Sequence, residues 1–259
     1  MSPVRTELRD AALIVTVDRP ETKNAVDPAV HDALRDAIDR AEGDAAVRAV
    51  VLTGAGASFV SGGDLKLIRE RPPEETLALS RQMTALLDRL EALPVLVIAA
   101  INGYAYGGGC EIALACDYRV AEARAKLSFR QAAMGLTTGW GAATRLSRLL
   151  PRGTALRLLA SAEVLDAARA REAGLVDEVV ADGASVARAC ELAVEVAQAS
   201  PRAVAGMKRV LAAAYGGTSI SARELEWEVF RSLWGAEDHR EALEAFFAKR
   251  PPRWSIRRE

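Results

Sequence analysis

Cysteine and histidine are scarce in this chain, which narrows the chemistry open to its 259 residues. The three cysteines are Cys110, Cys116 and Cys190, an odd and sparse set that fits reduced thiols better than a disulfide framework. Only two histidines accompany them, and the spacing of these residues matches no zinc-binding pattern. We therefore expect no metal centre.

Long apolar runs and an excess of charge of one sign are also missing. The longest useful apolar run is Val95–Ile101, whereas a membrane-spanning helix needs about 20 residues. The opening stretch MSPVRTELRD lacks the apolar segment of a signal peptide. The formal net charge of −1 gives no basic field for nucleic acid or a membrane surface. We expect a cytoplasmic protein that binds neither.

Half of the residues are apolar, and their patterns alternate between strands and helices. Buried strands are predicted over 13–17, 49–53 and 95–101, and shorter strands over 118–121, 127–129 and 176–180. Helices are predicted from Asp27-Pro28 and over 79–93. Helices alone follow, over 184–200, 201–214, 219–234 and 238–247. This order predicts an α/β core with a helical C-terminal region.

Two glycine-rich turns carry the strongest functional signal. Ser61-Gly62-Gly63-Asp64 and Tyr106-Gly107-Gly108-Gly109-Cys110-Glu111 each follow a strand, so a parallel layout would place both at one sheet edge. One main-chain N–H group from each turn would then bracket a single carbonyl oxygen. Glu111 lies one helical turn further on, where it can act as acid or base. Taken alone, the glycines at 107–109 would instead indicate close packing of a helix on a sheet.

Other glycine-dependent motifs are incomplete or absent. Gly54-Ala-Gly56 follows a strand, but Phe59 stands where a dinucleotide fingerprint needs its third glycine. The sequence contains neither GxxxxGK[ST] nor GxSxG, which argues against a P-loop enzyme and a serine hydrolase.

Six segments in a fixed order are spread along nearly the whole chain: RPETKNAV (19–26), FVSGGDL (59–65), AINGYAYGGGCEIALACD (100–117), FRQAAMGLTTGWGAATRL (129–146), AREAGLVDEVV (170–180) and AFFAKRPPRW (245–254). Together they resemble the crotonase superfamily, the enoyl-CoA hydratase/isomerase group. The resemblance implies an α/β fold in which ββα units stack into a superhelix over residues 1–195, with the acyl-CoA site. It also implies a helical region over 196–259 that builds homotrimers or dimers of trimers.

The resemblance further implies the substrate and an oxyanion hole. Family members act on acyl-CoA thioesters, and coenzyme A is part of the substrate, so no separate cofactor is expected. Gly63 and Gly108 match the two backbone donors that hold the thioester oxygen and stabilise the enolate. Glu111 matches the first of the two glutamates that family hydratases use.

The second glutamate is where this sequence departs from the family pattern. Its position is Gln131 when counted back from Gly135, and Ala133 when counted forward from Phe129. A neutral amide orients water but cannot shuttle a proton, and acid–base help is commonly worth ~10²–10⁴-fold. Three functions stay open: hydration of a 2-enoyl-CoA (or the reverse dehydration) with Glu111 alone, decarboxylation of a malonyl-type acyl-CoA, and non-catalytic binding of acyl-CoA. Isomerisation also depends on that second glutamate in the family.

Further positions match the surroundings of the substrate. Lys66 matches a position near the adenine and ribose of CoA, with a solvated lysine as the simpler alternative. Lys249 matches one that reaches the CoA phosphates, sometimes from a neighbouring subunit. Trp140 lies in the segment TTGWG (137–141), which replaces a proline-glycine stretch and would reshape the acyl pocket. The expected substrate-binding set is completed by Lys23, Ser61, Asp64 and Leu65.

Two remaining sets have plainer interpretations. A stripe at i, i+3 and i+7 is typical of a core or subunit-interface helix face, and it is formed by Trp227, Phe230 and Trp234. A second set lies in the loop that covers the pocket in family members, where one carboxylate could replace the missing acid: Glu70, Glu74 and Glu75. A solvated run of charges is the simpler interpretation of that set.

Overall fold

The computed structural model describes residues 2–216 and 219–255. Its larger sheet has six strands in the order β1-β2-β3-β5-β7-β10. Their bounds are Val4–Arg9 (β1), Ala12–Val17 (β2), Ala49–Gly54 (β3), Leu96–Ile101 (β5), Tyr118–Glu122 (β7) and Glu178–Val180 (β10). Only the β1–β2 pair is antiparallel; the other neighbours are parallel. Strands β2, β3 and β5 are almost wholly buried and apolar, as a parallel sheet covered on both faces requires.

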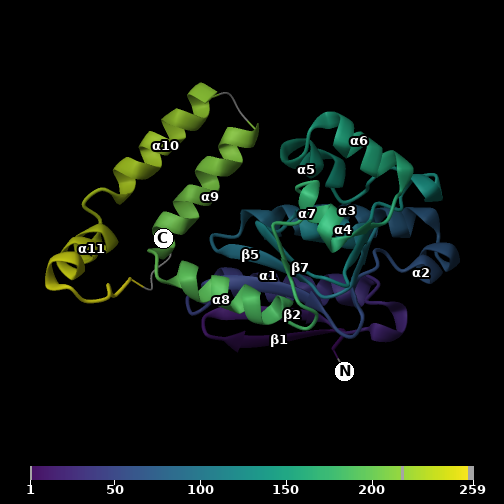
Figure 1. Ribbon diagram of the computed structural model, residues 1–259, viewed down its shortest axis with the longest axis horizontal. Coiled ribbons are helices and arrows are strands. Elements are labelled where there is room, and N and C mark those ends of the chain that lie inside the picture. Colours follow the sequence, from purple (N-terminus) through teal and green to yellow (C-terminus); the bar gives the residue numbers. More distant parts are fainter. Residues whose placement is uncertain (1, 217–218, 256–259) are drawn as a thin grey trace.

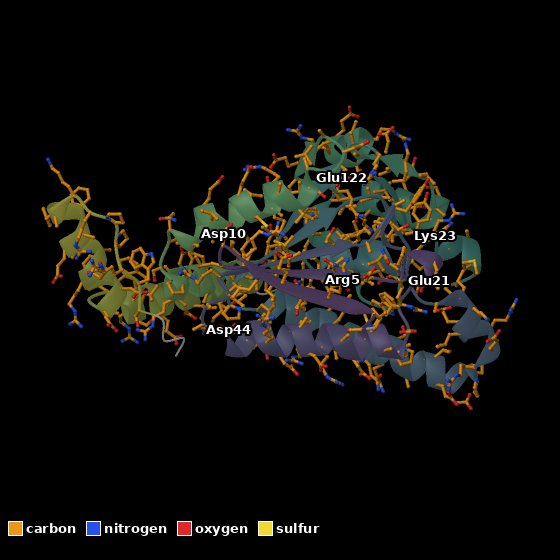
Figure 2. The ribbon with its side chains drawn as sticks, turned by 90° about the horizontal axis from the view of Figure 1, so that it is seen from below. Arg5, Asp10, Glu21, Lys23, Asp44 and Glu122 are labelled. Atoms are coloured by element: carbon orange, nitrogen blue, oxygen red, sulfur yellow. The ribbon has the colours of Figure 1, made fainter. Side chains whose placement is uncertain are left out.

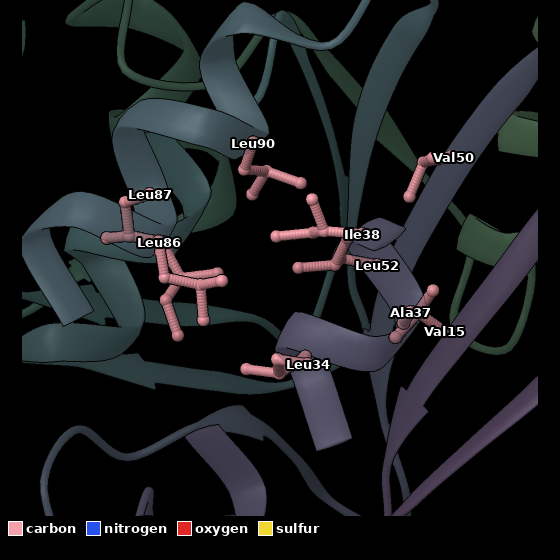
Figure 3. Close-up of a pocket in the computed structure, with 10 residues that line it drawn as sticks. Val15, Leu34, Ala37, Ile38, Val50, Leu52, Leu86, Leu87 and Leu90 are labelled. Atoms are coloured by element: carbon pink, nitrogen blue, oxygen red, sulfur yellow. The ribbon is translucent and has the colours of Figure 1, made fainter. Parts of the chain in front are cut away.

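Helices cover both faces of this sheet (Figure 1). On one face, apolar side chains of α1 (Pro28–Gly43) and α3 (Pro73–Ala92) pack against β2 and β3, as Figure 3 shows. Asp27 caps α1 by accepting a hydrogen bond from the Val30 amide at 2.9 Å, as its sequence position predicts. On the other face, α8 (Ser185–Ala197) packs its small residues on β3 and β5.

A second sheet of four short strands carries the functional turns. Its order is β4-β6-β8-β9, with bounds Ser58–Val60 (β4), Tyr104–Tyr106 (β6), Lys126–Ser128 (β8) and Leu165–Asp166 (β9). Each of β4, β6 and β8 directly follows a strand of the larger sheet and precedes a helix. This succession repeats a ββα unit along the chain, and the expected α/β class with stacked ββα units is confirmed.

Two buried asparagines join the sheets. Asn102, between β5 and β6, donates to the carbonyls of Gly54 and Gly56 at 2.8 and 3.0 Å. Asn24 donates to the carbonyls of Ser58 and Ala55 at 2.7 and 2.9 Å. Both side chains satisfy backbone groups where β3 gives way to β4, so they fix the start of the strand that leads to Gly63.

Several short elements surround these sheets. They are η1 (Pro20–Thr22), α2 (Leu65–Glu70), α4 (Gly108–Leu114), η2 (Ala132–Met134), α5 (Ala142–Leu149), α6 (Arg152–Ser161) and α7 (Ala167–Glu172). The last three helices are α9 (Pro201–Gly216), α10 (Ser219–Leu233) and α11 (Glu237–Ala248), and α10 and α11 project away from the sheets (Figure 1). In the part of the chain that the structure describes, no helix has the length and apolarity to cross a membrane.

The C-terminal helices are tied to the core through polar contacts. Lys208 on α9 donates to the Val95 carbonyl at 2.8 Å and pairs with Asp117 at 2.5 Å. The aromatic stripe formed by Trp227 and Phe230 on α10 and by Trp234 just after it stays at the surface, because these residues are 64%, 49% and 66% exposed. The alternative that this stripe belongs to the core is therefore wrong for the single chain, in which α10 packs chiefly on α9.

Candidate functional site

The two glycine turns lie side by side at one edge of the smaller sheet. Gly62-Gly63 follows β4, Gly107-Gly108 follows β6, and the two strands pair in parallel with Ser58 opposite Tyr104. The carboxyl ends of parallel neighbours meet at the same edge, as the sequence argument requires. The strands concerned belong to the second sheet, which the sequence patterns did not reveal. A Cβ built on Gly62 would lie 3.0 Å from the Gly108 nitrogen, so the turns touch.

The amide of Gly63 is directed away from its neighbouring segment. The Gly62 carbonyl accepts from the Val26 amide at 2.8 Å, and the Asp64 amide donates to the Val26 carbonyl at 2.9 Å. In such a parallel bridge the groups of the middle residue, Gly63, point to the opposite side. Among residues 2–216 and 219–255, the Gly63 N–H has no hydrogen-bond acceptor.

The amide of Gly108 is free for a different reason. Gly108 is the first residue of α4, and the first N–H groups of a helix have no partner inside it. Gly107 precedes it with φ +53°, a conformation that glycine adopts readily, and its own amide donates to the Ser128 carbonyl on β8 at 2.9 Å. Within the described chain, no side chain caps this end of α4.

The Trp140 ring lies against both turns. A Cβ added to Gly108 would be 2.2 Å from Cζ3 of the indole, and one added to Gly63 would be 3.8 Å from Cζ2. One side chain therefore packs on Gly108 and lies close to Gly63, at a spot next to both turns. The close approach to Gly108 is possible only because this residue has no Cβ.

Glu111 is buried beside that spot, with 2% of its surface exposed. Its Oε2 accepts hydrogen bonds from the backbone amides of Trp140 at 2.7 Å and Ala142 at 3.0 Å. Its Oε1 accepts one from the side-chain amide of Gln131 at 2.8 Å. Three N–H donors thus hold the carboxyl group in one orientation. The two carboxyl oxygens have about four lone-pair sites, so the group can still accept a hydrogen bond from a further partner.

Of the two positions considered for the second glutamate, Gln131 is the one whose side chain contacts Glu111. Ala133, in η2, is exposed on the surface. The Oε1 atom of Gln131 is buried and has no hydrogen-bond partner within the described chain. A buried amide oxygen without a partner is costly, which indicates an acceptor built for a water molecule or a substrate group.

Sequence reasoning missed the residue that supports Trp140 from behind. Arg145 is buried on α5, and its Nη1 donates to the Trp140 carbonyl at 2.8 Å. Its other guanidinium nitrogens bond to Asp88 and Glu91 on α3, at 2.7 and 2.9 Å. The sequence offered no clear signal for it, because α5 also carries Arg148 and the partners of Arg145 lie more than fifty residues away in sequence.

Of the expected substrate-binding residues, four lie on or beside the Gly63 turn. Ser61 Oγ donates to the Thr22 carbonyl at 3.2 Å, and Leu65 and Lys66 are exposed at the start of α2. Asp64 caps α2, accepting from the Lys66 and Leu67 amides at 3.1 and 3.2 Å, so it also has a structural role.

The two outer lysines lie apart from each other. Lys23 is exposed at the end of η1 and is labelled in Figure 2. Lys249 follows α11, at the far end of the molecule from α2 in Figure 1, so this chain does not bring it to its own glycine turns. The lid carboxylates Glu70, Glu74 and Glu75 are exposed. Among the described residues, no group of His, Cys, Asp and Glu side chains could hold a metal ion.

The cysteines near the site are chemically quiet. Cys110 precedes Glu111 on α4, Cys116 follows the end of that helix, and both are buried. Burial raises the pKa of the Cys110 thiol to about 12, and burial likewise raises the pKa of Cys116 to about 12. Thiols with such pKa values are not nucleophiles near neutral pH.

Comparisons with known proteins agree with this geometry. The family model described as enoyl-CoA hydratase/isomerase matches residues 7–257. The chain is 35% identical over 251 residues to a short-chain-enoyl-CoA hydratase of Clostridium acetobutylicum, covering 96% of each protein. It is 36% identical to an (E)-benzylidenesuccinyl-CoA hydratase of Thauera aromatica, over 96% of this chain and 98% of that one. A crystal structure of an enoyl-CoA hydratase from Bacillus anthracis superposes with a TM-score of 0.95 at 29% identity, covering 98% and 100%. The chain therefore belongs to the enoyl-CoA hydratase/isomerase family of the crotonase superfamily.

Proposed function

We propose that this enzyme hydrates a 2-enoyl-CoA, or dehydrates the corresponding 3-hydroxyacyl-CoA. The observation that carries the proposal is the position of the Glu111 carboxyl group, which lies one turn into the helix that begins at Gly108, where the Gly62-Gly63 turn touches Gly108. The family membership and the relatives named as hydratases support the same chemistry.

The two glycine amides would bind the thioester oxygen. As a nucleophile adds to C3 of the enoyl group, negative charge moves to that oxygen and gives an enolate. Two preorganised N–H donors stabilise this charge more than the neutral carbonyl, and one such donor is typically worth ~10²–10³ in kcat. Lys66 and Lys23 would contact the coenzyme A portion from the open side of the Gly63 turn.

Glu111 would manage both protons of the added water. As base, it takes one proton from water while the water oxygen bonds to C3. As acid, it then returns that proton to C2 of the enolate, so H and OH are both added and the carboxylate is restored. Gln131 would position the water through its buried Oε1, which is free to accept a hydrogen bond. No cofactor other than the coenzyme A of the substrate takes part.

The direct test is the loss of enoyl absorbance when the protein is mixed with crotonyl-CoA and longer 2-enoyl-CoAs. Decay that stops in the Glu111→Gln variant supports the proposal. If no short or medium enoyl-CoA reacts, the proposal fails, and tight binding of acyl-CoA without turnover would then identify a non-catalytic binder.

Decarboxylation of a malonyl-type acyl-CoA is the second candidate, favoured by one observation. The residue facing Glu111 is a neutral amide, and a neutral neighbour tolerates a substrate carboxylate better than a glutamate would. Loss of CO₂ would leave a thioester enolate with its charge on the same oxygen, and Glu111 in its protonated form would give its proton to C2 and regain one from solvent. Release of CO₂ from methylmalonyl- or ethylmalonyl-CoA would support this candidate, and hydration without such release would remove it.

The assembly and location follow from the same family context. The exposed aromatic stripe of α10, together with exposed Phe246 and Phe247 on α11, would be covered in a homotrimer or a dimer of trimers. Lys249 would then reach the phosphates of coenzyme A bound to a neighbouring subunit. Reduced cysteines and a lack of membrane-spanning helices in the described chain fit a cytoplasmic location.

A further inference from the structure

The indole of Trp140 lies where the acyl group of a bound thioester must pass. Its ring contacts Gly108 and lies next to Gly63, the two residues whose amides would hold the thioester oxygen. The carbon chain attached to that carbonyl therefore begins within van der Waals reach of the ring.

Little space remains around this ring. Only 8% of the Trp140 residue is exposed, so protein atoms already contact most of its surface. A carbon chain that extended past the thioester would either displace the indole or be turned away from it. The large side chain thus takes up volume that a longer acyl group would need.

The main chain that carries the ring is held at three successive points. The Trp140 amide donates to Glu111 at 2.7 Å, and its carbonyl accepts from Arg145 at 2.8 Å. The carbonyl of the preceding residue, Gly139, accepts from Thr84 Oγ1 on α3 at 2.9 Å. Moving the backbone would break the bond that orients Glu111, so the ring cannot retreat without disturbing the carboxylate.

We infer that Trp140 is the residue that limits the acyl group to short chains such as crotonyl. The inference rests on the proposed function, because it assumes that the thioester oxygen sits at the two glycine amides. It assigns the indole a role in selectivity that is separate from proton transfer, since its ring carries no group that could replace Glu111 as an acid or base.

The test compares chain-length preference in the wild type, Trp140→Ala and Trp140→Met. The readout is the ratio of kcat/KM for 2-octenoyl-CoA to kcat/KM for crotonyl-CoA. Removing the ring should raise this ratio by about tenfold or more, because a single methylene in an apolar pocket already changes rates by ~10–200-fold. The methionine variant, which fills less of the same space, should fall between the other two.

Leu34→Ala is the matched control, because it removes a buried apolar side chain from the pocket between α1, α3 and the sheet (Figure 3), whose lining includes neither glycine turn nor Trp140. It should lower stability and leave the ratio unchanged. A ratio that stays within twofold of the wild type in both Trp140 variants would overturn the inference while leaving the hydratase proposal intact.

Calorimetric binding of butyryl-CoA and octanoyl-CoA gives a second readout that needs no turnover. Wild type should bind butyryl-CoA more tightly than octanoyl-CoA, and Trp140→Met should reverse or remove that preference. If enoyl-CoAs are not hydrated, the function fails but this binding preference still decides the role of Trp140. Equal preference in wild type and variant would refute it.

Discussion

The side-chain amide of Gln131 donates to Oε1 of Glu111 at 2.8 Å, so a neutral group touches the one buried carboxylate of the site. In a hydratase with two glutamates, two carboxyl groups would share the work that falls here on Glu111 alone. The first prediction follows from this arrangement.

Glu111→Gln should lower kcat for crotonyl-CoA by ~10²–10⁴-fold, because the site loses its proton carrier. The carboxamide oxygen can still accept from the Trp140 and Ala142 amides, so the fold should persist. Loss of enoyl absorbance measures the rate. Glu74→Gln, at an exposed carboxylate on α3, is the control and should keep full activity. If activity survives in Glu111→Gln and disappears in Glu74→Gln, the proton carrier is Glu74 and not Glu111.

Gln131→Glu should add a second titration to the pH–rate profile. Two carboxyl groups at this separation cannot both ionise at their ordinary pKa values, so one of the pair should titrate at a raised pKa. The pH–rate profile of the wild type should lack this second titration. Gln131→Ala, which removes the donor to Glu111, should slow hydration and should not add a second titration. Identical profiles for wild type and Gln131→Glu would contradict the contact.

Gly108→Ala should reduce kcat by about 10²–10³-fold, the usual effect of losing one oxyanion donor. The new methyl group would lie 2.2 Å from Cζ3 of Trp140, so the ring or the amide must shift. The double variant Gly108→Ala with Trp140→Ala removes that collision. Its loss should be smaller than the product of the two single losses, and strictly multiplicative effects would show that the two residues do not touch.

Alkaline pH should destabilise the protein through its two enclosed thiols. The pKa of Cys110 is raised from 9.0 to about 12 by burial, and the pKa of Cys116 is raised in the same way. The unfolded chain therefore loses these protons first, so stability is complete below pH 9 and declines as the pH rises toward 12. Unfolding midpoints across this range measure the decline, and a Cys110→Ala, Cys116→Ala variant should show less of it. A thiol reagent at pH 8 should modify both only after denaturation.

Substituting the aromatic stripe of α10 should change the size of the assembly. Trp227→Ser combined with Phe230→Ser removes apolar surface that the single chain leaves in water, and sedimentation velocity should then detect smaller species. Leu77→Ser removes an exposed leucine from α3 and should leave the mass unchanged. An unaltered mass in the α10 variant would locate the subunit contact elsewhere.

The long elements of this fold were readable from sequence because each carries a periodic pattern of sufficient length. The strand predicted over 95–101 is observed as Leu96–Ile101, and the helix predicted over 201–214 as Pro201–Gly216. Of the second sheet, the sequence anticipated only β8, as the strand predicted over 127–129. The other strands span two or three residues, too few for an alternating pattern, and tertiary pairing creates them.

The candidate site likewise has residues that local sequence features indicate and contacts that only the tertiary structure creates. Gly63, Gly108 and Glu111 could be singled out because glycine turns after strands and a nearby carboxylate are local features. Which of Gln131 and Ala133 faces Glu111 depended on the turn of η2, where Gly135 closes with φ +73°. The contact of Trp140 with Gly108 joins residues 32 positions apart and follows only from the packing of α5 on α4.

Every residue of α4, from Gly108 to Leu114, is buried, whereas most of residues 132–139 are exposed. The helix that bears the reactive carboxyl group therefore has almost no position that can mutate freely. Substitutions that alter substrate choice have more room at Trp140 and in the exposed segment before it, because these side chains are not part of that helix. Such a separation would let descendants of this chain acquire new acyl preferences without first losing their chemistry.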